Sequence, residues 1–180
     1  MYRIAGIIFF YIPIQLLRAQ CDDEEIELWG NCYGVEVTYE LNLSGQELSG
    51  SIPNAISQLS NLMFLDLSNN NLEGAIPQEI VNMETLLGFN LSHNSLTGGI
   101  PEELGNLTNL MSMDLSHNQL SGTVPSSIGN MTGLVEISLG HNLLSGELPI
   151  EIGQLMFLSV FLANDNQFTG IITDNICESG

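Results

Sequence analysis

The sequence has almost no positive charge: its 180 residues include only two basic side chains, Arg3 and Arg18, against 21 acidic ones. All of the acidic residues lie from Asp22 onward, and the formal net charge at pH 7 is -19. Binding to nucleic acid requires basic side chains that displace counterions from the phosphate backbone, so nucleic acid is excluded as a partner. An acidic surface is consistent with solubility, or with a cation-rich setting in which screening weakens self-repulsion.

After its first twenty residues the sequence also lacks any apolar run long enough to cross a bilayer. The apolar run Ile4–Ile14 follows an arginine and is too short for a comfortable membrane span. We therefore predict a signal peptide over 1–20, cleaved near Ala19 or Gln20. A retained anchor and a lipidated Cys21 are the alternatives. The mature chain is predicted to be secreted, extracellular or at the cell surface, without a membrane span.

Motifs for catalysis or cofactor binding are also missing: the sequence contains no nucleophile elbow, phosphate loop or Cys-His cluster. We therefore expect neither enzymatic activity nor a bound cofactor. Asp66 and Asp114 would lie two turns apart in the repeat described next, at ~9.6 Å. This spacing superficially resembles the carboxylate pair of an inverting glycosidase, but no general-acid environment accompanies it.

The residues that are present repeat every 24 positions. The stretch Leu65–Pro77, LDLSNNNLEGAIP, recurs in units that start near positions 41, 65, 89, 113, 137 and 161. Copies at one constant interval, without insertion or deletion, predict a solenoid over 41–180 whose turns bury their apolar side chains against each other. Leu65 and Leu67 alternate along a short strand and would both point into the core.

Polar and conformationally special residues form columns of their own. Asparagines recur at 70, 94, 118, 142 and 166, where buried amides would hydrogen-bond the backbone of their own and the neighbouring turn. The glycine column from Gly50 to Gly170 suits the positive φ that such bends require. The proline column from Pro53 to Pro149 fixes φ after each bend.

Residues 21–40 break the repeat, and we expect them to cap a first turn whose apolar edge would otherwise face water. In a secreted chain, Cys21 and Cys32 can close a loop that stabilises this cap; two free thiols are the alternative. Cys177 has no partner in the sequence, which leaves open an edge-paired or Cys177-mediated dimer.

Written as one unit, the repeat is Leu-x-x-Leu-x-Leu-x-x-Asn-x-Leu-x-Gly-x-Ile-Pro-x-x-Ile-x-x-Leu. Over positions 41–178 it resembles the plant-type leucine-rich repeat, and Trp29–Cys32 looks like the N-terminal cap of that class. The class includes extracellular parts of receptor-like proteins and kinases, and polygalacturonase-inhibiting proteins. The resemblance implies an α/β solenoid: a right-handed superhelix of about six turns, with a parallel β-sheet on the concave face and short 3-10 or loop segments on the convex face.

Three positions depart from the pattern of that class. Gln46 stands in place of the ladder asparagine, Thr173 in place of proline, and Ser179 in place of the closing apolar residue. No paired-cysteine segment follows the last unit, so we expect the C-terminal cap to be absent or atypical.

The resemblance also implies that ligands bind on the concave face, at the strand positions that lie beside and between the inward leucines. We expect Phe64 to be the best anchor in an apolar patch with a polar rim. The candidate residues are Met63, Phe64, Asp66, Ser68, Leu87, Asn90, His93, Met111, Asp114, His117, Glu136, Ser138, His141, Val160 and Leu162. The alternative is that the apolar column Met63, Leu87, Met111 and Val135 partly tucks under the preceding turn.

All three histidines, His93, His117 and His141, occupy a single column. Imidazoles ~4.8 Å apart on neighbouring strands are close enough to share a metal or to sense pH. Because Ser-His-Asn is a common variant of the repeat's Ser-x-Asn segment, we predict no metal site. Four asparagines begin Asn-x-Ser/Thr glycan acceptors that the repeat consensus also generates: Asn42, Asn90, Asn106 and Asn130.

Together these features predict a secreted, non-catalytic recognition module that binds a protein, a peptide or a cell-wall glycan. Two alternatives belong to other classes. One is an inhibitor that blocks the cleft of a polysaccharide hydrolase, and the other is a structural, surface-binding or ice-binding repeat protein. The columns on the concave face differ from turn to turn, which favours recognition over binding to a regular lattice.

Overall fold

The structure is a computed structural model that describes residues 21–170. The predicted signal peptide, the substitutions at Thr173 and Ser179, and Cys177 lie outside the described residues. Within residues 21–170, no helix is long and apolar enough to cross a membrane.

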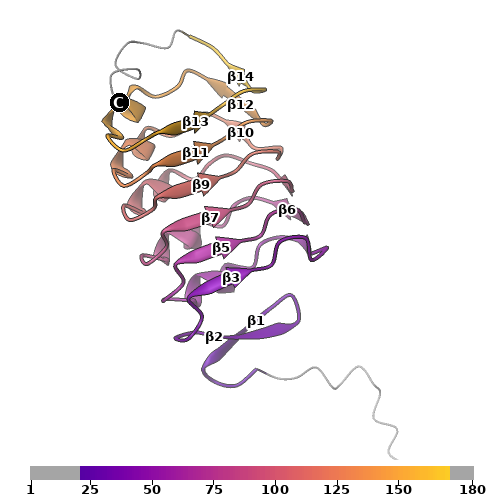
Figure 1. The fold of residues 1–180 in the computed structure, drawn as a ribbon. Helices are drawn as coiled ribbons and strands as arrows, with labels where there is room; N and C mark the ends of the chain where they lie inside the picture. The colour runs from indigo at the N-terminus through magenta and orange to yellow at the C-terminus, as the bar shows by residue number, and fades with distance from the viewer. Residues whose placement is uncertain (1–20, 171–180) are drawn as a thin grey trace, which may run out of the picture.

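The described chain coils into a solenoid whose main sheet has six parallel strands, one from each turn (Figure 1). Each strand pairs with residues 24 positions away, for example Leu41 with Leu65 and Phe89 with Met113. The constant repeat length therefore becomes an exact register between turns. The strands are β3 (Glu40–Asn42), β5 (Phe64–Asp66), β7 (Gly88–Asn90), β9 (Ser112–Asp114), β11 (Glu136–Ser138) and β13 (Val160–Leu162).

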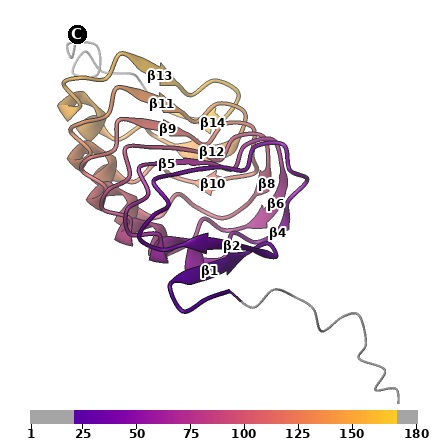
Figure 2. The same cartoon turned by 60° about the horizontal axis from the view of Figure 1, so that its bottom comes forward.

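Shorter elements form the other sides of each turn, as the view in Figure 2 shows. Two-to-four-residue strands form two parallel three-stranded sheets: β4 (Ser49–Gly50), β6 (Asn71–Gly74) and β8 (Ser95–Leu96), then β10 (Ser121–Gly122), β12 (Leu143–Gly146) and β14 (Gln167–Phe168). A 3-10 helix follows each of them up to β12: η2 (Asn54–Gln58), η3 (Gln78–Asn82), η4 (Glu102–Asn106), η5 (Ser126–Asn130) and η6 (Ile150–Gln154).

The proline column sets where each 3-10 helix begins. Pro53, Pro77, Pro101, Pro125 and Pro149 directly precede the five helices, with φ between -61° and -70° and extended ψ. Proline is preorganised for this entry position and has no N–H that the helix would leave unpaired. The glycine column provides the preceding bend, since Gly50 through Gly170 have φ between 79° and 87°, a region that glycine enters without steric cost.

The core is a single stack of apolar columns. Leu65 and Leu67 are 2% and 0% exposed, and the other inward positions of that unit are equally buried: Leu62, Leu72, Ile76, Ile80 and Met83. Their equivalents in neighbouring turns join them in one cluster. The predicted inward set is therefore confirmed.

The asparagine ladder is also confirmed, and Asn118 shows how it works. Its Nδ2 donates to the carbonyls of Leu115 and Ser116 in its own turn, at 3.2 and 3.1 Å, and of Leu91 in the preceding turn, at 3.0 Å. Its Oδ1 accepts the N–H of Leu96, also in the preceding turn, at 3.0 Å. One buried amide thus ties two turns together and leaves no donor unpaired.

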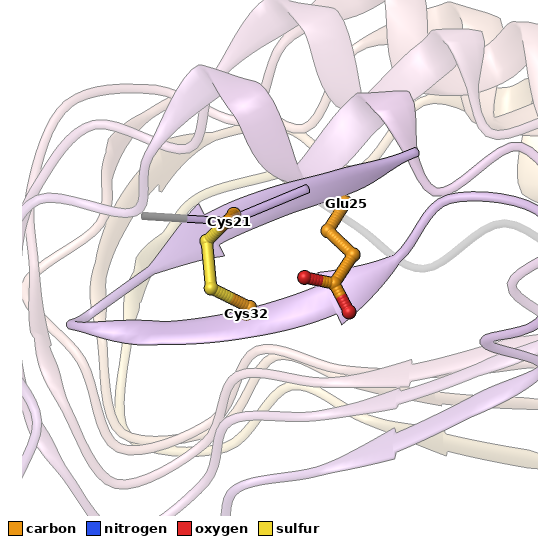
Figure 3. A group of neighbouring side chains, drawn as sticks. All are labelled: Cys21, Glu25 and Cys32. Carbon is orange, nitrogen blue, oxygen red and sulfur yellow. A yellow bond between two sulfur atoms is a disulfide. The ribbon is translucent and has the colours of Figure 1, made fainter. Parts of the chain in front are cut away.

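The N-terminal cap is an antiparallel pair, β1 (Glu25–Leu28) with β2 (Asn31–Gly34). The predicted disulfide joins Cys21 to Cys32 beside this pair, with 5.5 Å between their Cα atoms (Figure 3). Glu25 lies next to the bridge, but both sulfurs belong to the disulfide. Among the described residues, Cys21, Glu25 and Cys32 are the only group of side chains whose ligand atoms lie close enough to hold a metal ion. Because both cysteines are in the disulfide, the group has no thiolate to bind a metal.

Candidate functional site

The register of the main sheet arranges its outer side chains in two rows that cross the strands. One row contains Phe64, Gly88, Ser112, Glu136 and Val160. The other contains Asp66, Asn90, Asp114, Ser138 and Leu162. The side chains between these positions, such as Leu65 and Ile137, point into the core and are buried. The two rows thus bring predicted site residues from five turns to the outer side of the sheet, although Gly88 and Ser138 are buried there.

Phe64, the predicted aromatic anchor, lies on this surface. Its side chain is 49% exposed, and its ring lies against Gly88, with Cδ1 3.4 Å from where a Cβ of residue 88 would stand. Because Gly88 has no side chain, the surface is hollowed beside the ring. A shallow depression of about 370 Å³ results, lined by Phe64, Gly88, Phe89, Asn90, Ser112, Asp114 and Glu136. Its wall therefore combines an aromatic face with two carboxylates.

The apolar column that precedes the strands is exposed in some turns and half-buried in others. Met63 and Met111 are 37% and 49% exposed, whereas Leu87 and Val135 are half-buried. The alternative that this column tucks under the preceding turn therefore describes Leu87 and Val135 better than the methionines. At the far end of the sheet, Leu162 is 48% exposed and Val160 is half-buried.

Two predicted site residues, Ser68 and Ser138, are buried, so the prediction that they offer binding surface is wrong. Ser68 is 3% exposed, and its hydroxyl is hydrogen-bonded to the hydroxyl of Ser44 in the preceding turn at 2.9 Å. Ser138 is 7% exposed, because the longer Asp114 and Leu162 flank its short side chain in register.

The three histidines form a stacked ladder on the exposed surface. The ring centroids of His93 and His117 are 4.0 Å apart with planes 11° from parallel, and those of His117 and His141 are 4.1 Å and 18° apart. Lone pairs of imidazole nitrogens lie in the ring plane, so stacked rings do not aim them at a common metal ion. At the end of the ladder, His141 Nδ1 lies 3.2 Å from Asp165 Oδ2.

The position of His117 within the ladder affects its proton affinity. Desolvation lowers the pKa of His117 below its ordinary value, and like charge on His93 and His141 lowers it further, whereas Asp114 and Asp165 act in the opposite direction. All three histidines, together with Asn69 and Asp165 in the same column, have φ between 53° and 55°. Asn, Asp and His are the non-glycine residues that enter this left-handed region most readily, which explains why the column uses these three types.

The predicted glycan acceptors differ in accessibility. Asn42, Asn106 and Asn130 are exposed, the latter two at the ends of η4 and η5. Asn90 is half-buried, and its Oδ1 already accepts the N–H and the hydroxyl of Ser92 at 2.9 and 2.7 Å. Glycosylation stays a prediction at all four positions.

Among the exposed apolar residues that were not predicted, three lie close together in the sequence. Ile150, Met156 and Phe157 are 63%, 78% and 68% exposed, and they lie on or just after η6, before β13. A comparison between repeats could have identified them, because the residues 24 positions earlier are not large and apolar: they are Ser126, Thr132 and Gly133. These residues do not line the depression beside Phe64.

Comparison with known proteins agrees with this geometry. The family model described as Leucine Rich Repeat matches five consecutive stretches of the chain: 39–59, 61–83, 85–107, 109–131 and 133–155. Among the curated proteins, none gives a significant match. Many solved structures give a significant match.

Three of these structures show the range of the similarity. The GASSHO1/SCHENGEN3 ectodomain of Arabidopsis thaliana, in complex with CASPARIAN STRIP INTEGRITY FACTOR 2, is 36% identical with a TM-score of 0.70; the match covers 72% of this chain and 16% of that one. The Arabidopsis receptor kinase HAESA, in complex with the peptide hormone IDA and the co-receptor SERK1, is 32% identical with a TM-score of 0.70; the match covers 77% and 28%. The SOBIR1 ectodomain of Arabidopsis thaliana is 31% identical with a TM-score of 0.68, covering 79% and 75%. The chain therefore spans about a sixth to a quarter of the longer ectodomains and three quarters of the SOBIR1 ectodomain.

Proposed function

This chain belongs to the plant-type extracellular leucine-rich-repeat family, and on that premise we propose that it recognises a peptide or an extended protein segment on the outer face of its main sheet. The proposed role is non-catalytic and takes place outside the cell or at its surface. Similarity to the ectodomains of plasma-membrane receptors supports this setting.

The depression beside Phe64 is the observation that carries the proposal. In a regular solenoid, a large half-exposed aromatic ring next to a glycine is an irregular feature, and it provides both an apolar contact and room for a partner's side chain. Aromatic residues in such settings often contribute most of the binding free energy. Two of the similar ectodomains were solved with peptide ligands or partners bound, which supports a ligand of that kind here.

The outer rows also argue against a lattice-binding role. A surface that binds ice or a regular polymer would repeat one side chain in every turn, but the row through Phe64 changes to glycine, serine, glutamate and valine in successive turns. A surface that differs in each turn suits a ligand with its own specific sequence. Carboxylates on an open surface, without an enclosing pocket, likewise suit binding rather than acid–base chemistry.

A selection from a random peptide library tests the proposal. We expect peptides selected on the wild-type protein to lose at least about tenfold in affinity for Phe64→Ala, because the anchor ring is removed. Phe157→Ala is the matched control: it removes another exposed phenylalanine that does not line the depression, and we expect it to leave affinity unchanged. Equal effects of the two substitutions, or none from Phe64→Ala, would refute the proposed site.

A further inference from the structure

The second outer row of the main sheet alternates between amide and carboxylate in its first four turns, before Ser138 and Leu162. Asn42, Asp66, Asn90 and Asp114 follow one another in successive turns, so a carboxylate recurs in every second turn. In each of the four, Oδ1 accepts the backbone N–H of the serine two residues later, at 2.9 to 3.0 Å. The side chains are therefore held in one common orientation along the row.

This arrangement leaves one oxygen of each carboxylate unused. Asp66 and Asp114 each use Oδ1 for the serine N–H, and within residues 21–170 their Oδ2 atoms make no further hydrogen bond. Both side chains are only partly buried. The Oδ2 atoms of Asp66 and Asp114 are thus available to accept hydrogen bonds from a ligand. They belong to strands ~9.6 Å apart, which is two strand spacings.

An extended ligand that runs along the stack meets these acceptors at a defined interval. A polyproline II segment rises 3.1 Å per residue with three residues per turn, so residues i and i+3 are ~9.3 Å apart and point to the same side. Residues two or four apart would be ~6.2 or ~12.4 Å apart and would point in other directions. A fully extended β-strand also fails, because residues i and i+3 point to opposite faces.

The negative charge of the chain favours a positively charged ligand. No lysine or arginine occurs after Arg18, so no permanently charged basic side chain of the described residues competes for Asp66 or Asp114. His117 interacts electrostatically with Asp114, but it carries a charge only when protonated. The depression beside Phe64 is an independent feature of the same surface, and it brings the aromatic ring, Asp114 and Glu136 into one lining. A ligand with basic residues and an intervening apolar residue would match both features.

Resting on the proposed function, we infer that the ligand is a cationic segment in the polyproline II conformation. Its basic side chains at positions i and i+3 contact Asp66 and Asp114, and a residue between them packs on the Phe64 ring beside Gly88. The ion pairs lie on an accessible surface, so each contributes modestly. Their joint contribution depends on spacing, because the second contact forms intramolecularly once the first is made.

Three synthetic proline-rich peptides of equal length and charge test the spacing. Each contains one leucine and two 2,4-diaminobutyrate residues, whose short side chains report spacing more sharply than lysine; the basic residues are two, three or four positions apart. We expect the peptide with three-residue spacing to bind the wild-type protein about threefold to tenfold more tightly than the others at pH 7.5 and low salt. Calorimetric titration gives the three dissociation constants.

Substitutions then assign the contacts. Asp66→Asn and Asp114→Asn keep the Oδ1 acceptor and remove only the charge, so we expect the fold to persist and the preference for three-residue spacing to disappear. Glu102→Gln, on η4 away from the main sheet, is the control and should retain the preference.

Equal affinity for the three peptides, a preference that survives in both aspartate variants, or no measurable binding would overturn the inference. The proposed function would still stand in those cases if library-selected peptides remain sensitive to Phe64→Ala. It would fail separately if that sensitivity is absent, so the two outcomes are distinguishable.

Discussion

Two neighbouring columns of the solenoid share one backbone bend but have opposite surroundings. Asn118 is 9% exposed and ties adjacent turns together through its side-chain amide. His117, one position earlier, is exposed, and its ring stacks on those of His93 and His141. The asparagine is the same in turn after turn from 70 to 166, whereas the exposed column runs Asn69, three histidines and Asp165.

The contrast separates what builds the fold from what is free to vary. In the asparagine column from 70 to 166 the side chain itself satisfies backbone groups of its own and the preceding turn, so one residue type is kept. Gln46, in the first turn, is exposed and departs from this column. In the exposed column the backbone imposes a left-handed φ near 54°, and any residue that tolerates this φ serves. The fold therefore leaves the chemistry of exposed columns open, and the same freedom applies to the outer rows of the main sheet.

Asn118→Ala should have the largest effect on the asparagine side of this comparison. It leaves the buried N–H of Leu96 without its acceptor and removes three donated hydrogen bonds, so we expect a loss of about 3 kcal/mol in the free energy of unfolding. Urea denaturation measures this. A loss as small as that of a surface substitution, under about 0.5 kcal/mol, would show that the ladder contributes little.

Substitutions at His117 should separate backbone from side chain. His117→Val places a β-branched residue at φ 54°, and we expect it to cost about 1 to 2 kcal/mol. His117→Asn tolerates that φ and should be nearly neutral. If the two variants are equally stable by urea denaturation, backbone strain does not determine residue choice in this column.

Titration should show that His93 and His141 affect the pKa of His117. The pKa of His117 is lowered in part by His93 and His141, so replacing both with asparagine should raise it; NMR titration of the imidazole measures the change. A folded-state pKa below the unfolded value means that this group's contribution to stability is complete above pH about 6.5 and is lost as the pH falls below that value. An unchanged His117 pKa in the double variant would argue against the coupling.

The pH dependence of ligand binding should be the smallest effect. Protonation of the ladder adds positive charge near Asp114, so we expect the diaminobutyrate peptide with three-residue spacing to bind about twofold to threefold more weakly at pH 5.5 than at pH 7.5. Replacing all three histidines with asparagine should remove this difference in calorimetric titration. A pH dependence that persists in the triple variant would have to arise elsewhere.

The sequence predicts the architecture well and the accessible surface less well. The leucine, asparagine and glycine columns were predictable because stacking repeats one physical requirement in every turn. The burial of Ser138 was not, because it depends on which residues the register places beside it. The left-handed φ shared by His93, His117 and His141 was likewise not predicted, because only the glycine column of the repeat indicated positive φ. Phe157 was not predicted because the residue 24 positions earlier is Gly133, so the repeat pattern places no apolar side chain there.

The most direct test of the proposed binding surface moves the exposed phenylalanine from position 64 to position 88, one turn further along the solenoid. In the variant Phe64→Gly with Gly88→Phe, composition, core and asparagine ladder are unchanged. Once the ring of Phe64 is removed, the nearest atom to a Cβ at residue 88 is the carbonyl oxygen of Ser112, at 3.7 Å. Peptides selected on the wild-type protein are measured against this variant, together with its free energy of unfolding. We expect the variant's free energy of unfolding to lie within about 1 kcal/mol of wild type and its affinity to fall at least tenfold. Retention of wild-type affinity in the folded variant would contradict the claim that the outer rows specify the partner.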